Sequence, residues 1–195
     1  MKNFKIENFL FNKNSKPYLI AEISSNHMGS LNKTLKLIKE IKKAGAHAVK
    51  LQTYTEDTMT IDSRKKEFII NDGIWKNYNL YKLYSEAKTP WTWYDKIFKY
   101  CKKLKITCFS TPFDETSVDF LENYNVPAYK IASYEIVDLP LIKYVAKKKK
   151  PLILSTGMAN LDEIGRAIKT VKKTGNNKII VLHCVSKYPS KHSDY

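Results

Sequence analysis

The chain has 195 residues, 43% of them hydrophobic and 27% charged, which is typical of one soluble globular domain. No apolar run approaches the roughly 18 residues of a membrane helix. The amino terminus lacks the apolar core of a signal peptide, and three widely spaced cysteines predict no disulfide framework, so we expect a cytoplasmic protein without a membrane partner. The net charge of +15 is mostly lysine, with Arg64 and Arg166 as the two arginines. Because arginine is the preferred reader of bases, we expect a solvated lysine-rich surface and no nucleic-acid partner.

In chain order, the first predicted element is a hairpin or cap over residues 1–17, because apolar residues alternate weakly before Pro17. Six short segments rich in aliphatic and β-branched residues follow, as expected of fully buried parallel strands. They span residues 18–24, 48–54, 106–112, 128–133, 151–157 and 179–185. Helical spacing of apolar residues predicts helices at 31–44, 93–104, 115–124, 139–148 and 161–173.

This alternation predicts βαβ units and one α/β domain over residues 18–195. Six parallel strands fit a doubly wound sheet, and they also fit about six-eighths of a (β/α)8 barrel of the TIM type. The first strand is not followed by G-x-G-x-x-G, which weakens the dinucleotide-binding version of the first architecture. The strand pattern by itself leaves the two architectures open.

Residues 55–92 interrupt the alternation with a long segment after the second strand. The segment is rich in aromatic residues, including Trp75, Tyr78, Tyr81, Tyr84 and Trp91. A long insertion at the carboxyl end of a strand is where a barrel keeps its substrate contacts. The alternative is a packed helical hairpin whose aromatic side chains form a core, and the sequence favours neither interpretation.

Polar side chains stand in or directly after strands that should be apolar, toward the carboxyl end of each strand. They are Glu22, Lys50, Gln52, Thr111, Lys130, Ser133, Glu135, Ser155, Thr156, His183, Ser186 and Tyr188. The carboxyl edge of a parallel sheet is its ligand-binding edge. Lysines supply point charge and hydroxyls supply directional hydrogen bonds, so this set suits a small, doubly charged anion beside a polar neutral partner.

Three other interpretations of these residues stay open at this point. Lys50 and Lys130 could form structural ion pairs with Glu22 and Glu135, because an isolated buried charge is costly. His183 could be a hydrogen-bonded core histidine. A lysine on a strand could also form a Schiff base, as in class I aldolases, if burial lowered its pKa.

Several motifs resemble, in order and spacing, those of the sialic acid synthase family. They are IAEISSNHMGS (20–30), GAHAVKLQTY (45–54), FSTPF (109–113), PAYKIASYE (127–135), PLILSTGMA (151–159) and LHCVSKYP (182–189). Residues 73–98, with GIW, LYKLY and TPWTW, resemble the pseudaminic acid branch of that family. The resemblance implies a TIM barrel, of which about six βα strands are present. It also implies a small antifreeze-like domain, absent from these residues, and a homodimer for the full-length family.

The resemblance further implies a reaction and roles for individual residues. Phosphoenolpyruvate would condense with an amino sugar, 2,4-diacetamido-2,4,6-trideoxy-L-altrose, and water to give pseudaminic acid and phosphate. Positions that hold phosphoenolpyruvate match Lys50, Thr111, Lys130, Ser133, Ser155 and Ser186. Glu22 and Glu135 match catalytic carboxylates that face the sugar, and Tyr188 matches a sugar-contacting tyrosine. Gln52 is placed with the substrate-binding set; like Asn26 and His27, it lies in a matching motif without a further role.

A divalent metal, manganese or magnesium, is expected for the full-length family, where it would polarise the sugar aldehyde. The family's metal-binding histidines come later in the chain, so no metal ligand is expected before residue 195. We therefore expect a shortened synthase whose 195 residues are inactive or fragmentary by themselves. The alternatives are an N-acetylneuraminate or legionaminate synthase and, in another class, a non-catalytic phosphoanion-binding fragment. The aromatic segment favours the pseudaminic acid branch over its sisters.

Overall fold

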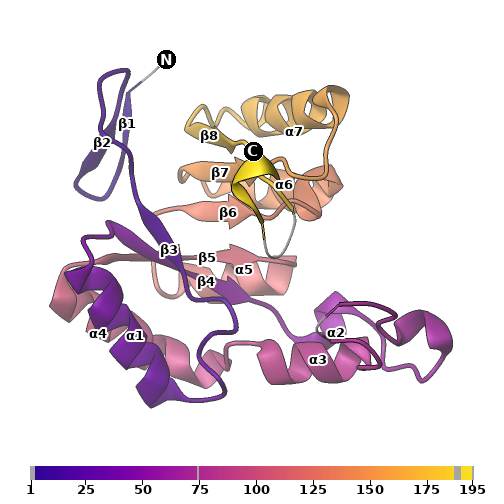
Figure 1. Cartoon of the computed structure of the whole chain (residues 1–195). Helices are drawn as coiled ribbons and strands as arrows, with labels where there is room; N and C mark the ends of the chain where they lie inside the picture. Colours follow the sequence, from indigo (N-terminus) through magenta and orange to yellow (C-terminus); the bar gives the residue numbers. More distant parts are fainter. Residues whose placement is uncertain (1–2, 74, 187–189, 195) are drawn as a thin grey trace. The chain divides into compact units, whose positions relative to one another are not determined.

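The computed structural model describes residues 3–73, 75–186 and 190–194 (Figure 1). The chain divides into two compact units, one formed by residues 19–108 and the other by residues 1–18 together with 109–195. We refer to them as the 19–108 unit and the 109–195 unit. The parallel sheet has the strand order β3-β4-β5-β6-β7-β8, and the boundary between the units falls within β5 (Thr107–Pro112).

The 19–108 unit begins with a βαβ arrangement of β3 (Ile20–Glu22), α1 (Leu31–Lys43) and β4 (Ala48–Thr53). Its last helix is α4 (Tyr94–Leu104). The two strands pair in parallel, with Glu22 opposite Lys50. Helix α1 begins after Ser30, whose hydroxyl accepts a hydrogen bond from the Lys33 N–H group, and is followed by Gly45 at φ +86°. A serine cap and a left-handed glycine are the signals that favour helix boundaries at these positions.

Residues 55–92 of the same unit form a series of short elements. These are α2 (Glu56–Met59), the 3-10 turns η1 (Lys66–Phe68) and η2 (Trp91–Trp93), and α3 (Leu80–Ala87). Helices α2 and α3 lie in contact, and Lys88 forms an ion pair with Glu56. Contacts among its own residues therefore contribute to the order of this segment.

The 109–195 unit contains an antiparallel pair, β1 (Phe4–Ile6) with β2 (Phe9–Phe11), and the carboxyl-terminal part of the parallel sheet. The sheet part comprises the end of β5, β6 (Tyr129–Ile131), β7 (Leu152–Ser155) and β8 (Ile179–Leu182). Its helical elements are α5 (Glu115–Glu122), η3 (Glu135–Val137), α6 (Leu139–Lys147), α7 (Leu161–Lys173) and η4 (His192–Asp194). Helices α6 and α7 pack side by side (Figure 1). No helix of the described residues combines the length and apolar character that crossing a bilayer requires.

The prediction of fully buried strands is correct in the middle of the strand order and wrong at both of its ends. All residues of β5, β6 and β7 are buried, and in β4 only Gln52 is half-buried. In contrast, β3 has no buried residue, and Val181 of β8 is 45% exposed. Among the described residues, β3 and β8 are the first and last strands of the sheet, so each pairs with one neighbouring strand.

Candidate functional site

In the 19–108 unit, the strand register places an acid and a base side by side. Glu22 and Lys50 are direct neighbours on β3 and β4, and the Glu22 Oε2 atom lies 2.7 Å from the Lys50 Nζ atom. The Lys50 side chain is 3% exposed, while that of Glu22 is 50% exposed. The ion pair that the sequence left open is therefore present. It satisfies a buried ammonium group and leaves part of the carboxylate facing solvent, where a ligand can reach it.

His27 lies in the loop between β3 and α1 and is almost completely buried. Its Nδ1 atom accepts a hydrogen bond from the Gly29 N–H group at 3.0 Å, so the ring proton resides on Nε2, which donates to the Ala87 carbonyl at 3.1 Å. The ring meets Trp93 edge-on. Burial holds the pKa of His27 below its usual value, against the opposing effect of the Ala87 hydrogen bond. His27 thus joins this loop to the end of α3 as a neutral side chain.

Two aromatic side chains of residues 55–92, those of Tyr84 and Trp91, contact Tyr54 at the end of β4. Tyr54 is buried, its ring meets Tyr84 edge-on at a centroid distance of 5.9 Å, and its carbonyl accepts a hydrogen bond from the Trp91 indole at 3.3 Å. Burial raises the pKa of Tyr54 to about 12. Trp75 is different, because its side chain is 51% exposed. The packing interpretation therefore describes Tyr54, Tyr84 and Trp91, whereas Trp75 is open to a ligand.

In the 109–195 unit, hydroxyl groups gather around Gly157, which follows β7. The Ser133 hydroxyl accepts a hydrogen bond from the Gly157 N–H group at 3.3 Å. A Cβ atom at position 157 would collide with the Ser186 hydroxyl and would lie 3.1 Å from the Ser133 Oγ atom. Glycine therefore fits here without displacing its neighbours, whereas any larger residue would have to move the Ser186 hydroxyl. We call Ser133, Gly157 and Ser186 the hydroxyl cluster.

Two further hydroxyls end β7 beside this cluster. Ser155 is buried and its hydroxyl accepts a hydrogen bond from the Cys184 thiol at 3.3 Å. The Thr156 hydroxyl donates to the Leu182 carbonyl at 2.8 Å. These hydrogen bonds connect the end of β7 with the end of β8 and the residues that follow it. The result is a small polar surface at the carboxyl ends of β6, β7 and β8, of the kind that binds phosphate or carboxylate oxygens.

Lys130 and Glu135 supply the charges of this unit. Lys130 lies on β6 with 8% of its surface exposed, and Thr111 on β5 is completely buried. Glu135 begins η3, and its Oε2 atom is buried without a hydrogen-bond partner among the described residues. Burial raises the pKa of Glu135, while a hydrogen bond from its own backbone and the positive charge of Lys130 oppose the rise. Glu135 is therefore protonated over a wider pH range than an ordinary glutamate, as a general acid needs to be.

Two expectations from the sequence end differently. His183 is exposed, so its interpretation as a core histidine is wrong: β8 is the last strand of the sheet and leaves this position uncovered. Tyr188 lies outside the described residues.

Gly157 and Cys184 belong to the site but were not predicted from the sequence, although a glycine directly after a buried strand is itself a signal of close backbone approach. Among the described residues, no group of three or more His, Cys, Asp or Glu side chains is arranged to hold a metal ion.

Comparison with known proteins decides the family. A family model described as NeuB family matches residues 37–195. The chain belongs to the NeuB family. It is 45% identical over 184 residues to a pseudaminic acid synthase of Campylobacter jejuni, which covers 94% of this chain and 54% of that protein. It is 35% identical over 181 residues to an N,N'-diacetyllegionaminic acid synthase of Legionella pneumophila, covering 91% of this chain and 51% of that protein.

The solved structures agree with this family. The N-acetylneuraminic acid synthetase of Leptospira borgpetersenii, crystallised with citrate, superposes with a TM-score of 0.85 at 30% sequence identity, over 99% of this chain and 62% of that chain. The resemblance to the synthase family and the expectation of a TIM-barrel-type fold are thereby confirmed. This NeuB-family chain spans about half the length of the curated relatives it matches.

Proposed function

We propose that this NeuB-family chain belongs to an enzyme that makes pseudaminic acid. Phosphoenolpyruvate condenses with 2,4-diacetamido-2,4,6-trideoxy-L-altrose and water, and the products are pseudaminic acid and phosphate. The observation that carries this proposal is the 45% identity to a pseudaminic acid synthase over 94% of the chain. The lower identity of 35% to a legionaminic acid synthase supports the choice of sugar.

In the 109–195 unit, the hydroxyl cluster with Ser155 and Lys130 is proposed to hold the anionic groups of phosphoenolpyruvate. Hydroxyls and backbone N–H groups give directional hydrogen bonds to phosphate oxygens, and the lysine adds positive charge. The low exposure of Ser155 and Lys130 supports the proposal, because a buried cation and buried hydroxyls bind an anion more strongly than the same groups in water. Thr111 and Tyr188 are proposed to complete the substrate contacts.

The reaction forms one C–C bond and one C–O bond to water, and it breaks the C–O bond to phosphate. C3 of phosphoenolpyruvate attacks the sugar aldehyde, water adds at C2, and the tetrahedral intermediate releases phosphate. Glu135, whose pKa is raised by burial, is proposed to donate a proton to the aldehyde oxygen as the C–C bond forms. In the 19–108 unit, the half-exposed carboxylate of Glu22 is proposed to accept a proton from the water that adds at C2, with Lys50 holding its orientation. Gln52, on the same strand as Lys50, is proposed to contact the substrate.

The divalent metal, manganese or magnesium, would supply Lewis-acid activation of the aldehyde. The described residues offer no cluster that fits it, so we place its ligands elsewhere in the full-length enzyme and route no step through it. A cytoplasmic location and a homodimer complete the proposal. The alternatives are a sister synthase for N-acetylneuraminate or legionaminate, favoured by similarity across the family, and a fragment that binds a phosphoanion without turnover.

The test is phosphate release by the purified chain with phosphoenolpyruvate, manganese and each of the three candidate sugar precursors. Binding of phosphoenolpyruvate is measured in parallel by calorimetry, with Ser133→Ala as the test variant and Ser63→Ala as a matched control outside the cluster. Release with the altrose derivative alone supports the proposed reaction, and release with another sugar instead overturns the choice of substrate. Binding that Ser133→Ala weakens, without release with any sugar, supports the anion site and is the result expected both of a synthase that needs residues outside this chain and of the phosphoanion-binding alternative.

A further inference from the structure

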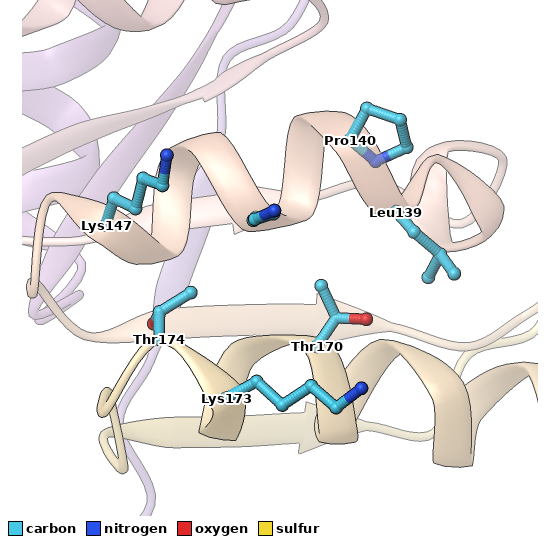
Figure 2. A pocket seen from close by; sticks show the side chains of 7 residues that line it. Leu139, Pro140, Lys147, Thr170, Lys173 and Thr174 are labelled. Atoms are coloured by element: carbon cyan, nitrogen blue, oxygen red, sulfur yellow. The ribbon is translucent and has the colours of Figure 1, made fainter.

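A groove of about 610 Å³ lies between α6 and α7, on residues that the proposed reaction does not use (Figure 2). It is lined by Leu139, Pro140, Lys143, Lys147, Thr170, Lys173 and Thr174. Lys143 and Lys147 are one helical turn apart on α6, and Thr170, Lys173 and Thr174 occupy one turn at the end of α7. Figure 2 shows the Lys173 side chain lying along α7 beside Thr170.

The positive charge of this groove is not neutralised by its surroundings. Among the described residues, no carboxylate lies within ion-pair distance of Lys143, Lys147 or Lys173. By contrast, the nearby Lys148 and Lys150 pair with carboxylates. The helix dipoles account for a lysine in the last turn of each helix, but Lys143 lies in the middle of α6 and has no such partner.

The other end of the groove is apolar. Leu139 and Pro140 open α6, and the nearby Val137 of η3 and Leu161 at the start of α7 are 53% and 86% exposed. Elements η3 and α7 are in contact. Exposed apolar side chains beside a groove mark a surface for a macromolecular partner.

We propose that the α6–α7 groove binds an acidic segment of a partner protein. Carboxylates of that segment pair with Lys143, Lys147 and Lys173, and an apolar side chain at one end packs against Leu139 and Pro140. Lysines without carboxylate partners favour a negatively charged segment, and the apolar end of the groove fixes the orientation in which that segment binds.

Two other classes of polyanion fit less well. A nucleic acid carries charge along its whole length and would leave the apolar end of the groove without a contact. An anionic membrane requires apolar side chains that protrude beyond the lysines, whereas these lysines line a concave surface. Both remain as explicit outcomes of the test.

The probe is a fluorescein-labelled decaglutamate peptide that ends in two leucines, and the readout is fluorescence anisotropy with the intact chain. Replacing the three lysines together, Lys143→Glu, Lys147→Glu and Lys173→Glu, should weaken binding about tenfold or more, because three attractions become repulsions. The milder glutamine replacements should weaken it by a smaller factor. Circular dichroism and thermal unfolding establish that each variant is folded.

The matched control replaces three exposed lysines of the 19–108 unit, Lys36→Glu, Lys39→Glu and Lys96→Glu, and so changes the net charge equally. Retained binding in this control, with loss in the groove variant, supports the proposal. Equal loss in both variants, or no binding of the peptide by the unaltered chain, overturns it. So does a thymidine oligonucleotide, or vesicles containing phosphatidylserine, that bind more tightly than the peptide and depend on the same three lysines.

Discussion

Replacing Gly157 with alanine places a methyl group inside the hydroxyl cluster. The new Cβ atom collides with the Ser186 hydroxyl and lies 3.1 Å from the Ser133 Oγ atom and 3.2 Å from the Cys184 Cβ atom. Overpacking of this kind costs about 1–3 kcal/mol when the neighbours cannot move. Ser186 is exposed and its hydroxyl can rotate, so we expect the low end, about 1 kcal/mol, or about 2–4 °C in the melting temperature of a chain of this size.

The same change should have a larger effect on ligand binding than on stability. A hydrogen bond to a charged group contributes about 1.5–3 kcal/mol, so displacing one hydroxyl from the anion should weaken phosphoenolpyruvate binding about 10- to 150-fold. Calorimetric titration measures the affinity, and urea denaturation measures the free energy of unfolding. Adding Ser186→Ala to Gly157→Ala removes the colliding oxygen, so the double variant should regain stability without regaining affinity.

Gly165→Ala is the matched control, because Gly165 lies within α7 and no atom lies within 4 Å of its added methyl group. It should raise stability by about 0.5–1 kcal/mol, as alanine does relative to glycine inside a helix, and leave affinity unchanged. The reasoning is refuted if folded Gly157→Ala protein binds phosphoenolpyruvate as tightly as the unaltered chain. In that case the hydroxyl cluster is not the anion site.

Three further predictions concern ionisable groups. Glu22→Gln should lower the free energy of unfolding by about 1–3 kcal/mol, because the buried Lys50 ammonium loses a charged partner that is itself half-exposed. Urea denaturation near neutral pH measures this change, and an unchanged free energy of unfolding would contradict the prediction. The pKa of His27 is lowered in the folded protein, because folding favours the neutral ring. The contribution of neutral His27 to the free energy of unfolding should therefore be fully present above the unfolded-state pKa of about 6.5. It should be lost as pH falls through the lower pKa of the folded state. His27→Gln should remove that loss and His183→Gln, at an exposed site, should keep it; identical pH profiles for the two variants would contradict the assignment. The pKa of Glu135 is raised, so ionisation costs stability as pH rises through and above the folded pKa. Glu135→Gln should therefore be more stable than the unaltered chain at alkaline pH and not at acidic pH, and a pH-independent difference in denaturation would argue against it.

The sequence predicted the succession of elements closely because hydrophobic periodicity is a local property. The helix expected at 161–173 is α7 with the same bounds, and its start carries a capping box between Asn160 and Glu163. The expected strands are longer than those observed, as at 128–133 against Tyr129–Ile131. The last residues of those segments turn away from the ladder to carry the polar side chains, including Ser133.

The roles of the aromatic residues in the long segment could not be predicted from local sequence patterns. Its aromatic content predicted either substrate contacts or a core, and both interpretations use the same residues. Only the packing of Tyr54 against Tyr84, with Trp75 left exposed, separates the side chains that stabilise the unit from one that is open to a ligand. The sequence spacing could not make that distinction, because it does not encode which side chains meet across thirty residues.

The sequence by itself determined that polar residues end successive parallel strands, and its motifs identified the family. Tertiary structure decided what each of those residues does. The Glu22–Lys50 pair exists because β3 and β4 are in a register that sets these residues opposite each other. The shifted pKa values of His27 and Glu135 come mainly from burial. Register and burial depend on segments distant in the chain, so they can be known only once the chain has folded.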